Sequence, residues 1–219
     1  MALKTFVKIS AVNNLSDARY CAGMGVDMLG FALEADNPDF ITPEKYAEII
    51  GWISGVQFVG EFEASNLEQI KTILENYPVN ALQITNDSII EQIQRKKKKE
   101  NLEGFIPIIL KIGIMTTFCD IDDLHGLCGE YEKTVDYFLL EHLDKKPDDV
   151  FSEWELGHLL KLTAKFPIIL GCCVNKNNVN DLIDNYNIAG ISLKGGTEIR
   201  AGYKDFDDLA EILEVIEID

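Results

Sequence analysis

Short apolar runs rich in β-branched residues recur along the chain, with polar segments between them. Apolar runs of this length, bounded by polar segments, are typical of buried strands. Eight runs fit the description: 5–10, 28–33, 56–62, 81–84, 106–114, 137–141, 167–174 and 189–193. The pattern therefore predicts eight strands.

The segments between these runs carry the signals of helix starts. Two starts have the spacing of a capping box, in which an N-cap side chain and a glutamate three residues later satisfy each other's backbone groups. These are Ser65 with Glu68 and Ser152 with Glu155. Helices are predicted over 15–24, 43–52, 66–75, 87–99, 120–132, after 152, over 177–185 and over 205–215.

Eight strand-then-helix units in 219 residues come to about 27 residues each, close to the compact end of a (β/α)₈ barrel. The alternative is an open doubly wound sheet, which usually has fewer strands and a glycine-rich phosphate loop after the first strand. Here the first strand runs into Ser-Ala-Val-Asn-Asn, and no G-x-G-x-x-G or G-x-x-x-x-G-K-[ST] occurs. We predict one α/β domain over residues 1–219, a single (β/α)₈ TIM barrel.

Alternation along the first strand places Phe6, Lys8 and Ser10 on one face. A buried charge needs a partner or water, so this face suits the open end of a barrel. Functional groups of such barrels lie at the carboxyl ends of the strands. The residues expected at this mouth are Ser10, Glu34, Glu61, Asn86, Glu141, Cys172, Cys173 and Lys194.

Two features of the mouth allow two readings each. Lys8, Glu61 and Lys111 could form a buried ion network, or Lys8 could extend its ammonium group towards water at the mouth. Ser10 could occupy a nucleophile or base position, or it could hydrogen-bond local backbone groups at the strand end. The sequence leaves both questions open.

Composition excludes some classes of function. The chain has 37 acidic and 20 basic residues and a net charge of −17, which disfavours nucleic-acid binding. No run of roughly 18 apolar residues and no apolar signal core occurs, so we expect a cytoplasmic protein without a membrane partner. The five cysteines show no CxxC spacing, so we expect reduced thiols, with no metal and no cofactor.

Several segments, in order, resemble one family of barrel enzymes. "VKIS" with "NNLSDARYCAGMGVDMLGF" is similar to K-[IV]-C-G followed by S-x-x-D-A and G-A-D-x-x-G-F, and "ALQITN" to A-[VL]-Q-L-H-G. "FLLE" is similar to F-L-L-D, "ILGCCVNKNNV" to L-A-G-G-L-N-P-x-N-V, and "GISLKGGTEIRAGYKDF" to G-V-D-V-S-S-G-V-E-x-x-P-G-x-K-D. The chain resembles the phosphoribosylanthranilate isomerase family of tryptophan biosynthesis over nearly its whole length.

The resemblance implies an Amadori rearrangement of an aldosylamine to a ketosamine, which needs an acid and a base on either side of the sugar. In the family a cysteine ending the first strand is the base and an aspartate ending the sixth is the acid. Ser10 and Glu141 stand at these positions and are the implied catalytic residues. An alcohol is a poor base unless a neighbour activates it, whereas Glu141 keeps the carboxyl group.

The resemblance also implies a site for the substrate. Asp39 aligns with the family arginine that meets the anthranilate carboxylate, and therefore repels that anion. Ser192 aligns with a family aspartate, and Gln83 lies in the "ALQITN" motif. Asp39, Gln83 and Ser192 are the expected substrate-binding residues.

A phosphate site is implied at the last strands. The glycine-rich loop after the sixth strand is replaced by "HLDKKPDDV", and Cys172 and Cys173 stand where the family has paired glycines. Lys194 with Gly195 and Gly196 combines a cation with permissive backbone, as an anion requires. These five residues are the expected phosphate-binding set.

The residues and the family resemblance together leave three possible functions. The chain could be a divergent isomerase with impaired activity, a barrel enzyme acting on another small phosphorylated metabolite, or a non-catalytic binding or regulatory barrel. Nothing in the sequence indicates an oligomeric state.

Overall fold

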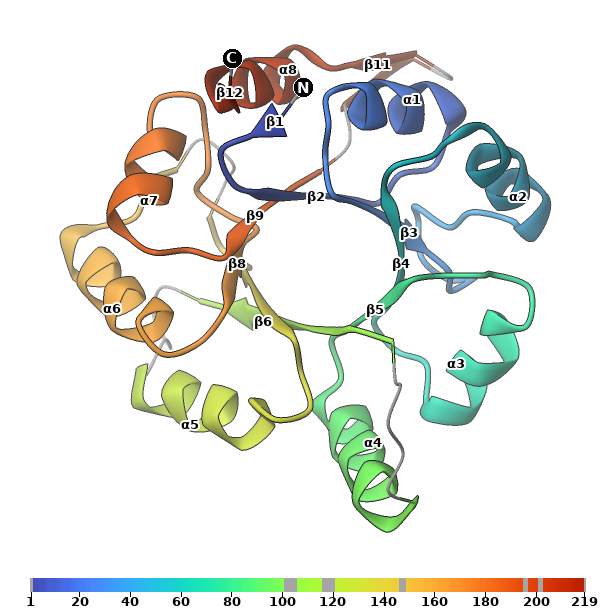
Figure 1. The fold of residues 1–219 in the computed structure, drawn as a ribbon, viewed down its shortest axis with the longest axis horizontal. Coiled ribbons are helices and arrows are strands. Elements are labelled where there is room, and N and C mark those ends of the chain that lie inside the picture. Colours follow the sequence, from blue (N-terminus) through green and yellow to red (C-terminus); the bar gives the residue numbers. More distant parts are fainter. Residues whose placement is uncertain are drawn as a thin grey trace.

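Eight parallel strands close into a barrel in the order β2 to β9, and helices surround it (Figure 1). The structure is a computed structural model that describes residues 2–100, 106–115, 121–145, 149–194, 197–200 and 203–218. Each strand leads into a helix that packs on the outside, so the predicted (β/α)₈ architecture is confirmed.

The barrel strands are β2 (Phe6–Ser10), β3 (Met28–Ala32), β4 (Gln57–Phe62), β5 (Ala81–Ile84), β6 (Ile108–Ile114), β7 (Tyr137–His142), β8 (Ile168–Leu170) and β9 (Gly190–Lys194). The helices are α1 (Leu15–Gly23), α2 (Pro43–Trp52), α3 (Leu67–Leu74), α4 (Asp87–Glu100), α5 (Ile121–Tyr131), α6 (Glu153–Thr163), α7 (Val179–Asn185) and α8 (Asp207–Val215). Wherever both helix ends were predicted, they lie within two residues of the prediction.

The start of α3 differs from the prediction. Asn66, not Ser65, is the N-cap, because its side chain accepts from the backbone N–H groups of Glu68 and Gln69 at 3.1 and 3.0 Å. The Gln69 side chain closes the capping box by accepting from Asn66 N at 2.8 Å. The backbone N–H of Ser65 is bound instead to the carboxylate of Glu34, which keeps Ser65 outside the helix.

The capping box predicted at α6 is confirmed. Ser152 Oγ accepts from Glu155 N at 3.3 Å, and the Glu155 carboxylate accepts from Ser152 N at 2.6 Å. The two reciprocal bonds satisfy backbone N–H groups that have no partner inside the helix, and they fix where α6 begins.

Two antiparallel strand pairs outside the barrel were not predicted. β1 (Ala2–Leu3) pairs with β12 (Glu217–Ile218), which brings the two ends of the chain together beside α8 (Figure 1). β10 (Thr197–Arg200) pairs with β11 (Tyr203–Asp205) after the last barrel strand. Strands of two to four residues are too short to show a periodic hydrophobic pattern.

The inward-facing side chains of the barrel form an apolar lower layer and a polar upper layer. The lower layer is one buried cluster of Met28, Val59, Ala81, Ile109, Leu139 and Ile169, with Phe6 and Tyr137 packed on it. Two residues further along the strands, on the same inner face, the chain places Lys8, Glu61, Gln83, Lys111, Glu141 and Ser192. The polar layer therefore lies nearer the carboxyl ends of the strands, where barrel enzymes carry their sites.

The outer faces of the strands pack against the helices in a second, much larger apolar cluster, which holds the helical shell on the barrel. No helix within the described residues is both long and apolar enough to cross a membrane.

Candidate functional site

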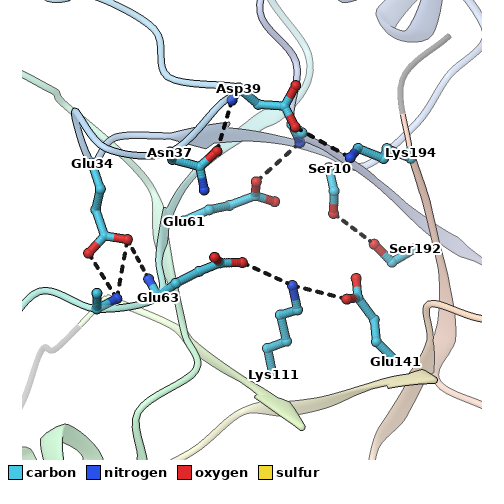
Figure 2. A network of polar contacts seen from close by, with 12 residues as sticks. Ser10, Glu34, Asn37, Asp39, Glu61, Glu63, Lys111, Glu141, Ser192 and Lys194 are labelled. Atoms are coloured by element: carbon cyan, nitrogen blue, oxygen red, sulfur yellow. Dashed lines mark hydrogen bonds and ion pairs between the residues drawn. The ribbon is translucent and has the colours of Figure 1, made fainter. Parts of the chain in front are cut away.

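Charged and hydroxyl side chains from six strands and their following loops gather at the mouth of the barrel. Figure 2 shows Ser10, Glu61, Lys111, Glu141 and Ser192 pointing towards a common space. Ser10 ends β2 and Glu141 lies near the end of β7, so both predicted catalytic residues occupy the same end of the barrel. Gly195 and Gly196, predicted to bind phosphate, lie outside the described residues.

Lys8 is fully buried and held by an ion pair. Its Nζ pairs with Glu61 Oε1 and donates to Ser10 Oγ at 2.6 Å. Glu61 also accepts from Ala11 N at 3.1 Å, and the backbone of Ala11 is left-handed (φ 55°). Lys8 therefore does not extend into water at the mouth.

Gly30 leaves the space that this ion pair fills. A Cβ atom added at Gly30 would lie 2.7 Å from Glu61 Cδ and 2.9 Å from Lys8 Nζ. Such contacts are too short for an ordinary side chain, so the buried ion pair requires a residue without a side chain at this position of β3.

Ser10 is held by side chains. Besides the bond from Lys8, its hydroxyl lies 3.1 Å from the hydroxyl of Ser192 on β9, a buried residue (Figure 2). An ammonium has three donors and no lone pair, so Lys8 can donate to Ser10 but cannot take its proton. Lys8 therefore uses the Ser10 oxygen as an acceptor, whereas either hydroxyl can donate in the contact between Ser10 and Ser192.

Lys111 on β6 is bound by two carboxylates, Glu141 Oε2 at 3.0 Å and Glu63 Oε1 at 3.2 Å (Figure 2). Burial alone would lower the pKa of Lys111, but its attraction and hydrogen bonds to Glu141 and Glu63 outweigh that effect and raise it. The predicted network of Lys8, Glu61 and Lys111 is thus correct only for the Lys8–Glu61 pair. Lys111 meets Glu63 instead, two residues further along the same face and nearer the mouth.

The absence of a side chain at Gly171 leaves space for the side chain of Glu141. A Cβ atom at Gly171 would lie 2.9 Å from Glu141 Cγ and 3.0 Å from Leu139 Cδ1. Glu141 therefore extends across the end of β8 into the mouth, where it reaches Lys111.

Asp39 and Lys194 face each other at the rim. Asp39 lies in the loop between β3 and α2, Lys194 ends β9, and their Oδ2 and Nζ atoms are 3.3 Å apart (Figure 2). The Lys194 side chain is 74% exposed and that of Asp39 31%. The structure thus pairs a predicted substrate-binding residue with a predicted phosphate-binding residue.

Glu34 is bound by backbone rather than by a cation. Its carboxylate accepts from the N–H groups of Glu63, Ala64 and Ser65, at 2.6, 3.0 and 2.5 Å (Figure 2). Burial raises the pKa of Glu34, but the hydrogen bonds from Glu63, Ser65 and Ala64 outweigh it and lower that pKa below its ordinary value. Glu34 therefore fixes the loop that carries Glu63, a role the sequence did not reveal because its partners are about 30 residues away.

Gln83 on β5 belongs to the polar layer, and its Oε1 atom has no hydrogen-bond partner among the described residues. A buried carbonyl oxygen without a partner is uncommon and is a natural acceptor for a ligand group.

Cys172 and Cys173 follow β8. Cys173 is buried in a left-handed backbone conformation (φ 56°), and Cys172 Sγ lies 3.7 Å from Leu140 O. Hydrogen bonding to Cys173 and burial raise the pKa of the Cys172 thiol far above its usual range. Cys21, Cys128, Cys172 and Cys173 are all free thiols, as expected for the described cysteines.

The segment after β7, where the resemblance expects a glycine-rich loop, is attached to the start of α6. Lys145 Nζ binds the Glu155 carboxylate at 2.6 and 2.7 Å and Val150 O at 3.2 Å. His142 contacts the same carboxylate through Nε2 at 3.3 Å. The sequence predicts only a capping role for Glu155, and local patterns do not indicate its ion pair with Lys145. Among the described residues, no group of His, Cys, Asp or Glu could hold a metal ion.

The arrangement of a barrel with a polar mouth can be compared with known families. The family model of N-(5'-phosphoribosyl)anthranilate isomerase matches residues 7–215. The chain belongs to this family. The family resemblance inferred from the sequence motifs is therefore confirmed over nearly the full length.

Curated relatives and solved structures agree. The N-(5'-phosphoribosyl)anthranilate isomerase of Thermotoga neapolitana is 27% identical over 216 residues, covering 95% of this chain and 96% of the relative. That of Syntrophus aciditrophicus is 25% identical, covering 97% and 87%. The crystal structure of the Thermotoga maritima isomerase has a TM-score of 0.76 at 22% identity, covering 97% of this chain and 98% of that one. The structural likeness shows a common fold.

Proposed function

We propose that this chain is a divergent phosphoribosylanthranilate isomerase that binds a small phosphorylated metabolite at the barrel mouth and performs the Amadori rearrangement very slowly or not at all. Family membership supports the mouth as the site and the rearrangement as the reaction. The observation that carries the proposal is the 2.6 Å hydrogen bond from the buried Lys8 ammonium to Ser10 Oγ.

The hydrogen bond from Lys8 makes Ser10 a poor general base. The rearrangement requires a group that removes the proton from C2 of the sugar. Ser10 would need a neighbour that accepts its hydroxyl proton, as in nucleophilic serines. Lys8 is instead a donor paired with Glu61, and Ser192 offers only a second hydroxyl. General-base catalysis typically supplies about 10² to 10⁴-fold, and we expect most of this factor to be lost.

Recognition of the anthranilate carboxylate is impaired as well. Asp39 brings a negative charge to the rim where the family resemblance expects an arginine, so it repels the substrate carboxylate. Its pairing with Lys194 also engages the one mostly exposed lysine described on a barrel strand.

Of the three roles considered, that of the general acid is the best preserved. Glu141 lies at the expected strand end and faces the same space as Ser10 (Figure 2). Its Oε2 atom lies 3.0 Å from Lys111 Nζ, so one of its two oxygens is already engaged. A displacement of about 1 Å in a catalytic group can cost roughly 100-fold, so the longer glutamate is expected to reduce the rate further.

A second candidate is an enzyme acting on another small phosphorylated metabolite. The supporting observation is Gln83, whose buried Oε1 atom has no partner among the described residues and lies in the polar layer with Glu141 and Lys111. A sugar hydroxyl or amine could donate to it. Slow turnover of phosphoribosylanthranilate beside fast turnover of a related aldose phosphate would favour this candidate.

The test follows the fluorescence decrease as phosphoribosylanthranilate is consumed. Ser10→Cys alone is expected to leave the rate low, because Asp39 still repels the substrate, whereas Ser10→Cys combined with Asp39→Arg is expected to raise it. Ser10→Ala is the control and should leave any residual wild-type rate unchanged. A wild-type rate near that of an ordinary family member, or its loss in Ser10→Ala, would contradict the proposal.

A further inference from the structure

Each described lysine on a barrel strand is paired with a carboxylate of the chain itself. Lys8 pairs with Glu61, Lys111 with Glu141 and Glu63, and Lys194 with Asp39. An anionic ligand that is to bind one of these three lysines therefore has to displace a carboxylate that already holds it.

The three lysines differ in how easily they can be released. The Lys8 side chain is 0% exposed and that of Lys111 18%, and separating a buried ion pair leaves an uncompensated charge. Lys194 is 74% exposed, and an exposed pair is held only weakly. Lys194 is therefore the cation that a ligand can take over.

Lys194 also lies where barrel proteins commonly bind phosphate. Phosphate sites of (β/α)₈ barrels are frequently formed by the loops after the seventh and eighth strands, and Lys194 ends β9, the eighth strand of this barrel. A phosphate group carries nearly two negative charges at neutral pH and competes well with a single carboxylate for one ammonium group.

Asp39 is held in position while Lys194 is free to move. Asp39 N donates to Asn37 Oδ1 at 2.9 Å, and the loop is closed by the bond from Ile41 N to Ala32 O at 3.1 Å. At its other end, Glu34 ties the loop to the start of α3. The carboxylate thus remains beside the rim, and opening the pair requires only rotation of the exposed lysine side chain.

We infer that Asp39 is an internal anion that occupies Lys194 and competes with the phosphate group of a ligand. This inference rests on the proposed function, because it concerns the same mouth. We call this pair the Asp39–Lys194 latch. An anion binds when the Lys194 side chain turns from Asp39 towards it. The carboxylate left behind lowers the affinity for that anion. Asp39 then sets how strongly the mouth selects against negatively charged ligands.

The experiment titrates the full chain with inorganic phosphate and follows binding by NMR. Asp39→Asn removes the competing charge and is expected to tighten phosphate binding about 2- to 5-fold, the range of an exposed ion pair converted to a binding ratio. Lys194→Gln is expected to weaken binding in the wild type and to abolish the gain in the double variant. The gain should shrink as salt is added.

Asp36→Asn is the matched control. Asp36 is an exposed carboxylate of the same loop that makes no ion pair within the described part of the chain, so its removal changes net charge equally. A gain confined to Asp39→Asn and dependent on Lys194 supports the latch. An equal gain in Asp36→Asn, a gain that persists with Lys194→Gln, or no phosphate binding by either the wild type or Asp39→Asn would overturn it. Because the readout is binding, rapid turnover of phosphoribosylanthranilate would refute the proposed function and leave the latch standing.

Discussion

Replacing Glu61 by glutamine is expected to destabilise the barrel severely. The substitution keeps the shape of the side chain and removes its charge, so the Lys8 ammonium stays fully buried without its counter-ion. Removing one partner of a buried ion pair typically costs about 3–5 kcal/mol. For a chain of this size that corresponds to a fall in Tm of roughly 6–20 °C.

The assay is urea unfolding of the wild type, Glu61→Gln, and Lys8→Met with Glu61→Gln. The double variant removes both charges and is expected to regain most of the lost free energy of unfolding, because apolar replacements of buried ion pairs are often tolerated. Glu211→Gln is the control, since Glu211 and Lys176 form a pair at 2.7 Å whose side chains are about half exposed. Its cost is expected to stay below about 1 kcal/mol.

An equal fall in the free energy of unfolding in Glu61→Gln and Glu211→Gln would contradict a special role for the buried pair. A double variant less stable than Glu61→Gln would also contradict it, because Lys8 would then contribute through something other than its pairing with Glu61.

Three further substitutions, the last with a comparison variant in α1, test other parts of the mouth. Gly30→Ala places a Cβ atom against the buried ion pair and is expected to cost about 1–3 kcal/mol of unfolding free energy in thermal denaturation. Glu34→Gln is expected to cost about 1 kcal/mol at neutral pH. Because the folded-state pKa of Glu34 is lowered, its contribution is present above the unfolded pKa of about 4.3 and is lost as pH falls through the folded pKa. The stabilities of the two proteins should therefore converge in acid, and a constant difference would contradict this account. Ala11→Gly relieves a left-handed conformation and is expected to be neutral or stabilising by up to about 1 kcal/mol, whereas Ala22→Gly inside α1 should cost about 1 kcal/mol.

The fold could be predicted from local patterns because strand and helix periods are local properties. Alternation placed Lys8 and Ser10 on the inner face, and the position of strand ends placed Ser10 and Glu141 at one mouth. Each of these two predictions depends only on the sequence of the strand that carries the residue.

The pairing of charges could not be predicted in the same way. Glu61 and Glu63 share one face of β4 and its continuation, and only the stagger between strands decides which of them meets Lys111. The cap of α3 was mispredicted for a related reason. Ser65 is a good capping residue locally, but its N–H is bound to Glu34, far away in sequence.

We expect the mouth to perform the family reaction poorly. The most direct test is a single-turnover measurement with this chain in excess over phosphoribosylanthranilate, beside the isomerase from Thermotoga maritima under the same conditions. Excess protein largely offsets weak binding and exposes the chemical step. We predict a rate constant at least about 100-fold lower for this chain, the smallest loss expected for a missing general base. Rate constants within a factor of ten of each other would contradict this prediction and would show that the mouth retains an effective base.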